Sequence, residues 1–173
     1  MTNPEAVKHR YHDIFLSNHR HSFEPLSMVW KPNTTVAAVI ERNNAFLMVE
    51  ELIDGQRVIN QPAGHLDDNE SLVEAVIGEV AEETAWTFQP LAVLGIYRWQ
   101  HPLKKITHMR TTFIGNAVDH QPDRTLDKPV IRAEWFTREQ LLQADNLRSP
   151  LVLRCIDDYL SGQQYPLELL HNV

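Results

Sequence analysis

The sequence has little cysteine and no long apolar run, and each shortage excludes a class of protein. Cys155 is the only cysteine, so an intrachain disulfide and a multi-cysteine zinc site are excluded. The longest apolar runs, such as residues 36–40 and 46–49, are far shorter than the roughly 18 residues of a membrane-spanning helix. The N-terminus lacks the basic, apolar and small-residue pattern of a secretory signal. We therefore expect a cytoplasmic protein with no membrane association.

Positive charge is also scarce. The 173 residues include 16 Lys and Arg against 23 Asp and Glu, which gives a net charge of −7. This balance argues against nucleic acid as a partner, because binding to its phosphates needs clustered Lys and Arg. A metal-bridged polyanion stays possible. The 43% of hydrophobic residues is ordinary for a globular domain and excludes disorder throughout the chain.

The first 27 residues differ from the rest of the chain. They hold four of the nine histidines and equal numbers of acidic and basic residues, without a clear helical or strand period. We expect a poorly ordered tail over 1–27 with no catalytic role, followed by a single domain over 28–173. Met28 stands just before the first convincing strand and is a candidate alternative translation start.

Strands come first after the tail. Two β-rich runs, 35–42 and 45–51, flank Asn43-Asn44, a pair that tolerates positive φ, so a hairpin is predicted. Asp54-Gly55 marks a further turn, and it is followed by a short strand at 57–60 and a polar loop at 61–69.

Helices then alternate with further strands. Ser71 with Glu74 forms a capping box before an apolar helical pattern that extends to about Thr84. Strands are expected at 91–99, 106–118 and 130–136, and helices at 137–144 and 149–162. This order predicts an α/β fold in which helices flank a mixed sheet.

The helix predicted after Ser71 carries a stripe of carboxylates. At about 100° per residue, Glu79, Glu82 and Glu83 share one face within a single turn. Their mutual repulsion favours a compensating hard cation, Mg²⁺ or Mn²⁺, and such an ion promotes attack on phosphoanhydrides. Taken by itself, such a stripe is more commonly a solvated acidic helix face than a metal site.

The segment 64–86 resembles the catalytic box of the Nudix hydrolases. That box is Gly, five residues, Glu, seven residues, Arg-Glu, an apolar residue, any residue, Glu-Glu, any residue, Gly and an apolar residue. The matching positions are Gly64, Glu70, Glu79, Val80, Glu82, Glu83 and Trp86. The resemblance implies a Nudix α/β/α sandwich with Glu79, Glu82 and Glu83 as metal ligands and catalytic residues. It also implies that Glu70 and the Gly64 carbonyl contribute to the site.

Two positions depart from the box. Gly78 replaces the arginine that pairs with the loop glutamate in the family, and Ala85 replaces a glycine. Gly78 also costs a helix about 1 kcal/mol relative to alanine. A catalytically weak Nudix module that binds nucleotides is therefore one alternative.

Three further segments resemble the NudJ-type phosphatases. They are Asn60–Leu66, Asn146–Val152 and Ser161–Glu168. The resemblance covers about residues 33–170 and implies hydrolysis of hydroxymethylpyrimidine pyrophosphate, thiamine pyrophosphate and nucleoside di- and triphosphates, with release of orthophosphate. The alternative enzyme is a Nudix pyrophosphohydrolase acting on nucleoside triphosphates or nucleoside diphosphate sugars. Both a monomer and a homodimer are compatible with the sequence.

A basic and aromatic stretch follows the second group of strands. Trp99 is a candidate for stacking on a base, and Lys104, Lys105 and Arg110 are candidates for binding phosphate oxygens. Ordinary strand packing explains Trp99 equally well. His101 is a weaker candidate, for relaying a proton near pH 7, and Lys31 and Arg57 are further candidates without a discriminating feature. The general base is left open between Glu79, Glu83 and the outside carboxylates Asp119, Asp123, Asp127 and Glu134, whereas Cys155 is expected to be a buried small residue.

Overall fold

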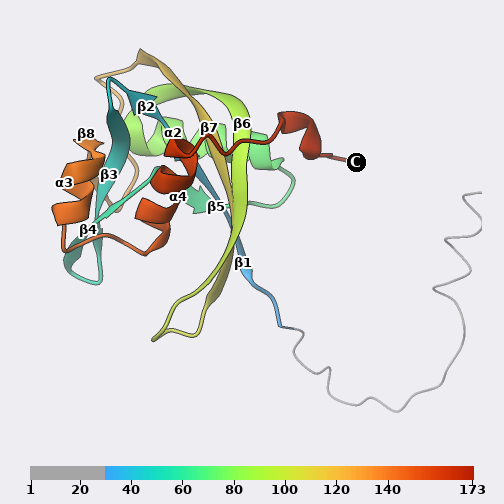
Figure 1. Cartoon of the computed structure of the whole chain (residues 1–173), viewed down its shortest axis with the longest axis horizontal. Coiled ribbons are helices and arrows are strands. Elements are labelled where there is room, and N and C mark those ends of the chain that lie inside the picture. Colours follow the sequence, from blue (N-terminus) through green and yellow to red (C-terminus); the bar gives the residue numbers. More distant parts are fainter. Residues whose placement is uncertain (1–29) are drawn as a thin grey trace, which may run out of the picture. The chain divides into compact units, whose positions relative to one another are not determined.

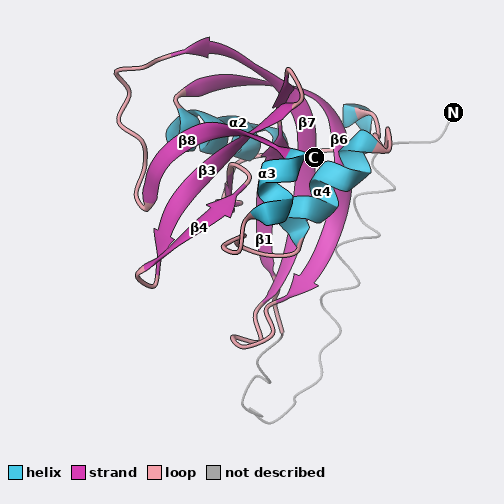
Figure 2. Cartoon of the chain, turned by 60° about the vertical axis from the view of Figure 1, so that its left-hand side comes forward, coloured by secondary structure: helices cyan, strands magenta, loops and turns pink. Residues whose placement is uncertain are grey.

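The computed structural model describes residues 30–173, whose strands form two four-stranded sheets with helices on both sides (Figures 1 and 2). The predictions about the tail at 1–27 and about Met28 lie outside these residues. Among the residues that are described, no helix is both long and apolar enough to cross a membrane.

The first sheet is mixed, as the sequence predicts. Its strand order is β5 (Ala63–His65), β1 (Asn33–Val39), β7 (Thr107–His120) and β6 (Trp86–Gln100). Strand β1 runs parallel to β7 and antiparallel to β5, and β6 and β7 form a long antiparallel hairpin (Figure 1).

The second sheet is antiparallel and centred on β3 (Ala45–Ile53). Strand β8 (Val130–Thr137) pairs with one edge of β3, and β2 (Glu41–Arg42) and β4 (Gln56–Asn60) pair with the other. Both predicted turns are confirmed. Asn43 and Asn44 have φ of 54° and 61°, and Asp54 and Gly55 have φ of 51° and 78°, so each pair adopts the left-handed conformation of a tight hairpin.

The structure corrects two of the predicted strands and one predicted loop. The run 35–42 divides at Ile40, so that β1 joins one sheet and β2 the other. The polar loop 61–69 contains β5, whose three residues pair with β1. Strand β6 begins at Trp86, five residues before the predicted start, because a register shift at Pro90 lets the pairing with β7 continue past this proline.

Two of the described α-helices begin at the predicted caps. The third begins one residue later than predicted, with Pro150 as its N-cap residue and no side-chain hydrogen bond to the cap. Helix α2 (Leu72–Thr84) and helix α3 (Arg138–Gln143) each start with a capping box, formed by Ser71 with Glu74 and by Thr137 with Gln140. Helix α4 (Leu151–Leu160) is followed by a short 3₁₀ turn at Leu167–Leu169. Ala85 ends α2 with φ of 59°, a conformation that costs an alanine more than the glycine of the Nudix box.

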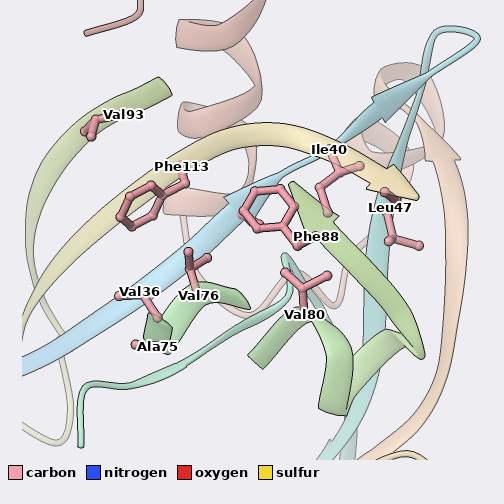
Figure 3. Close-up of a cluster of buried hydrophobic side chains, with 11 residues drawn as sticks. Val36, Ile40, Leu47, Ala75, Val76, Val80, Phe88, Val93 and Phe113 are labelled. Atoms are coloured by element: carbon pink, nitrogen blue, oxygen red, sulfur yellow. The ribbon is translucent and has the colours of Figure 1, made fainter. Parts of the chain in front are cut away.

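Two hydrophobic cores lie on opposite sides of the central strands. Val76 and Val80 of α2 pack with Ile40, Phe88 and Phe113 in one core (Figure 3). The other core joins α3 and α4 to the opposite faces of the same strands and includes Val39, Met48, Leu94, Leu141 and Ile156. Because side chains alternate along a strand, β1 and β3 are apolar on both faces and fix α2 on one side and α4 on the other (Figure 2).

Candidate active site

A cavity of about 390 Å³ opens beside α2, between residues of the two sheets and the start of α4. Its acidic lining residues are Glu51, Asp67, Glu79 and Glu83. Its basic and aromatic lining residues are His65, Trp99, His101, His108, Arg110 and Arg148. Carboxylates and cations therefore face the same space, which suits a ligand that combines a metal ion with phosphate groups.

Gly64, Glu79 and Glu83 form one side of the cavity, which we call the acidic wall. Within it, the side chain of Glu79 packs directly against the backbone of Gly64. A Cβ atom at position 64 would overlap the carboxylate of Glu79, so only glycine admits this side chain against the β5 backbone. The glycine of the box is therefore needed for space here, and it fixes where the carboxylate of Glu79 enters the cavity.

Glu83 lies one turn further along α2 and is 7% exposed. Its Oε2 accepts a hydrogen bond of 2.8 Å from the backbone N–H of Ala63, which ties the end of α2 to β5. Glu79 and Glu83 thus reach the cavity from successive turns of one helix, as the predicted stripe requires.

The surroundings of these two carboxylates oppose ionisation. Burial, followed by the charges of Glu82, Glu70, Asp67 and Asp127, raises the pKa of Glu79 to about 7. Burial raises the pKa of Glu83 to about 9, with further repulsion from Glu51 and Glu79, against the hydrogen bond from Ala63. A cation in the acidic wall would relieve both effects, because it favours the charged form of each carboxylate.

Glu82 and Glu70 do not line the cavity. Glu82 is exposed on α2, and its side chain acts on Glu79 through charge. Oε1 of Glu70 accepts a hydrogen bond of 2.6 Å from the backbone N–H of Asp67, so Glu70 closes the loop before α2 without an arginine. A Cβ atom at Gly78 would meet nothing within 4 Å, so the space of the missing arginine is open.

The basic stretch divides into residues inside and outside the cavity. Trp99 and Arg110 line it, and Trp99 stacks on His108 with ring centroids 5.7 Å apart, so its ring packs at the cavity rather than in the core. Lys104 and Lys105 are not among the lining residues. Lys104 instead forms an exposed ion pair of 2.9 Å with Asp54, and Lys105 lies in the β6–β7 turn with φ of 53°.

The weaker candidates, His101 for proton relay and Lys31 and Arg57 without a stated role, also divide into residues inside and outside the cavity. His101 lines the cavity, and its Nδ1 accepts hydrogen bonds from the backbone N–H groups of Leu103 and Lys104. Arg57 lies outside the lining and pairs with Glu50 at 3.1 Å, and Lys31 is not a lining residue either.

The outside carboxylates proposed as general bases are not lining residues. They are Asp119, Asp123, Asp127 and Glu134. Glu134 forms an ion pair of 2.9 Å with Arg132, and Asp127 acts on Glu79 through its charge. Cys155 is fully buried, as predicted, with its Sγ 3.7 Å from Oγ1 of Thr112.

Sequence patterns did not single out several of the lining side chains. They are Thr35, Glu51, Asn60, His65, His108 and Arg148. One usable signal was the pair Glu50-Glu51, because two carboxylates end an apolar run, although the pair does not show which of them faces the cavity. The register of the pairing between β3 and β8 shifts between Glu50 and Glu51, at the point where Glu51 lines the cavity.

Oxygen ligands dominate the acidic wall, which fits a hard divalent ion. Among residues 30–173, however, no three His, Cys, Asp or Glu side chains are grouped closely enough to hold a metal by themselves. Two carboxylates together with substrate phosphates and water make up the usual environment of Mg²⁺ in enzymes that act on phosphates. The residues present fit a metal ion of that kind, shared between protein and substrate.

Comparisons with known proteins agree with this geometry. The NUDIX domain family matches residues 31–154. The chain is 42% identical over 142 residues to the Escherichia coli K12 protein named Phosphatase NudJ, covering 82% of this chain and 92% of that one. A solved NUDIX hydrolase from Nitrosomonas europaea is 44% identical, with a TM-score of 0.81 over 83% of this chain and 98% of that one.

A more distant similarity concerns the fold alone. The NUDIX domain of Shewanella oneidensis NrtR, solved with ADP ribose, is 17% identical with a TM-score of 0.63. It covers 92% of this chain and 99% of that one.

Proposed function

Because the chain belongs to the NUDIX family of hydrolases and acts on phosphoanhydrides, we propose that it is a Mg²⁺-dependent phosphatase that releases orthophosphate from small pyrophosphates. Hydroxymethylpyrimidine pyrophosphate, thiamine pyrophosphate and nucleoside di- and triphosphates are the proposed substrates. Support comes from the 42% identity to Phosphatase NudJ over most of both chains.

The observation that carries the proposal is the pair of crowded carboxylates in the acidic wall. Glu79 packs on Gly64, and Glu83 is held by Ala63, so both carboxylates are placed before a metal arrives. NUDIX hydrolases generally use divalent metal ions. Bound Mg²⁺ neutralises phosphate oxygens and activates a water molecule. Glu82, Glu70 and the Gly64 carbonyl complete the proposed metal environment through charge and through water.

Arg110 and Arg148 line the cavity and form what we call the basic wall. In this proposal the basic wall binds the phosphate groups. Nε and Nη1 of Arg110 are buried and have no hydrogen-bond partner among the described residues, so both nitrogens are available to donate to phosphate oxygens. Arg148 lines the same cavity. Charge-assisted hydrogen bonds from arginine are the usual way to orient a phosphate. Trp99 packs along the organic part of the substrate at the cavity mouth.

A phosphate-release assay tests the proposal. The protein is incubated with each candidate pyrophosphate, with and without Mg²⁺, and orthophosphate, pyrophosphate and nucleoside monophosphate are measured separately. Mg²⁺-dependent orthophosphate supports the proposal. Pyrophosphate from nucleoside triphosphates indicates the alternative pyrophosphohydrolase, and tight binding without turnover indicates a module that only binds nucleotides, the alternative motivated by Gly78.

A cytoplasmic location, and a monomer or homodimer as the oligomeric state, stay predictions. Cell fractionation and light scattering are the measurements that check them.

A further inference from the structure

Beyond the two walls, the cavity has a third group of polar residues that the proposed chemistry does not use. Thr35, Glu51 and Asn60 line the cavity and are only 5%, 7% and 5% exposed. Each has a buried oxygen that finds no hydrogen-bond partner among residues 30–173: Oγ1 of Thr35, Oε2 of Glu51 and Oδ1 of Asn60. A buried polar atom without a partner costs free energy, so three in one place call for a ligand.

Strands of both sheets bring Thr35, Glu51 and Asn60 to the same cavity. Thr35 is in β1, where it lies next to His65 and Arg110 of the neighbouring strands in the first sheet. Glu51 and Asn60 come from β3 and β4 of the second sheet. The polar group therefore spans the junction of the two sheets, and Glu51 lies close enough to Glu83 of α2 for their charges to interact.

The chemistry of the orphaned atoms restricts what binds there. The free oxygens of Glu51 and Asn60 only accept hydrogen bonds when the carboxylate is ionised and the amide nitrogen of Asn60 is directed to Glu51. Burial raises the pKa of Glu51, and the charges of Arg148 and Arg110 together with the hydrogen bond from Asn60 act against this rise and favour the charged form. A phosphate would be repelled by this carboxylate, whereas a group with two N–H donors would satisfy both acceptors.

We propose that Glu51 and Asn60 form a subsite that accepts hydrogen bonds from an exocyclic amino group on the substrate's heteroaromatic ring, with Thr35 beside it. The subsite selects aminated rings over rings that carry a carbonyl oxygen at the same position. This inference rests on the proposed function in one respect, because the ring is attached to the pyrophosphate held by the other two walls.

Cytidine and uridine diphosphates give a matched test, because they differ at ring position 4 by an amino group against a carbonyl oxygen. In the wild-type protein we expect kcat/KM for cytidine diphosphate to exceed that for uridine diphosphate by about tenfold or more. Glu51→Gln should reduce this ratio to about 1 or below, because the glutamine amide donates to the carbonyl oxygen. Asn60→Ser, which replaces the amide oxygen with a shorter hydroxyl group, should lower the ratio in part.

Glu50→Gln is the matched control, because Glu50 is the neighbouring carboxylate on β3 but pairs with Arg57 and Arg132 outside the cavity. It should leave the ratio unchanged. Thermal melting of all variants identifies any that fail to fold, and in that case Asn60→Ser carries the test.

Binding of the monophosphates CMP and UMP, measured by calorimetry, separates the subsite from the proposed function. If neither diphosphate is hydrolysed but CMP binds more tightly and Glu51→Gln abolishes the difference, the phosphatase proposal fails and the subsite stands. Equal ratios in the wild type and Glu51→Gln overturn the subsite. The subsite is also overturned if Glu51→Gln binds Mn²⁺ more weakly while the ratio of kcat/KM values is unchanged, because Glu51 then belongs to the metal site.

Discussion

The acidic wall and the basic wall of the cavity are built in different ways. Gly64, Glu79 and Glu83 of the acidic wall come from one stretch, residues 64–83, in which a capped helix follows a short strand. Arg110 and Arg148 of the basic wall come from β7 and from the segment before α4. A wall made by one helix is visible as spacing in the sequence, whereas a wall made by distant elements is not.

The two walls also differ in which charge is unfavourably placed: buried negative charge in the acidic wall and, within the described residues, buried and unpartnered positive charge in the basic wall. In the acidic wall, burial and mutual repulsion raise the pKa of Glu79 and Glu83. In the basic wall, Arg110 has buried N–H donors without partners among residues 30–173. A metal ion bound to phosphates satisfies both, because the cation meets the carboxylates and the phosphate oxygens meet the arginine. In the proposed function, this difference between the walls sets which way round the substrate binds.

Removing a charge from the acidic wall should have the largest effect. Glu83→Gln should lower kcat by about 100-fold or more, because the metal that stabilises transition-state charge loses a ligand. The fold should persist, since the glutamine oxygen still accepts the hydrogen bond from Ala63. Steady-state phosphate release measures the effect. Glu168→Gln, at an exposed position, is the control, and a wild-type rate in Glu83→Gln would return the stripe to a solvated helix face.

Adding a single methyl group should disturb the acidic wall almost as much. In Gly64→Ala the new Cβ displaces the Glu79 carboxylate, and we expect kcat to fall roughly 10- to 100-fold, because a misplacement of about 1 Å is that costly. Stability should change little, since the end of a flexible side chain moves aside.

Gly78→Ala is the matched control for Gly64→Ala, because its Cβ meets nothing within 4 Å. It should stabilise the protein by about 0.5–1 kcal/mol in chemical denaturation while leaving the rate near wild type. Equal kinetics in the two alanine variants would show that the contact between Gly64 and Glu79 does not matter to catalysis.

Changes to the basic wall should act mainly on binding. Arg148→Ala should raise KM about tenfold with a smaller change in kcat, because it removes a charge-assisted contact to substrate. Lys104→Ala breaks only an exposed ion pair with Asp54 and should change KM less than about twofold. Initial rates over a range of substrate concentration decide between them. A larger effect from Lys104→Ala would place the phosphate site on the β6–β7 turn.

The smallest effect concerns stability and pH. The pKa values of Glu79 and Glu83 are about 7 and about 9 against an ordinary 4.5, so between these limits the folded protein binds more protons than the unfolded chain. The metal-free protein should therefore be most stable near about pH 5, and its melting temperature should fall steadily from there toward pH 9.

Saturating Mg²⁺ should reduce this fall in melting temperature, because metal binding replaces the protons on the carboxylates. Differential scanning calorimetry with EDTA and with Mg²⁺ measures both curves. A melting temperature that rises toward pH 9 without metal would contradict the electrostatic account of the acidic wall.

Local chemistry in the sequence determined the elements and the acidic wall. The capping boxes at Ser71 and Thr137 placed both helix starts, and the Asn43-Asn44 and Asp54-Gly55 pairs placed both hairpin turns. Each signal depends on neighbours within four residues, so no knowledge of the tertiary structure is needed. The 3.6-residue period likewise put Glu79 and Glu83 on one face before any sheet was known.

Only the tertiary structure decided what meets those carboxylates. The division of the first β-rich run at Ile40 sends β1 and β2 to different sheets, and the junction between those sheets brings Thr35, Glu51 and Asn60 to one cavity. Strand pairing between distant segments sets these positions, and a single sequence carries no period or cap that encodes it. The same reason separates Arg110, which lines the cavity, from Lys104 six residues earlier, which pairs with Asp54 in solvent.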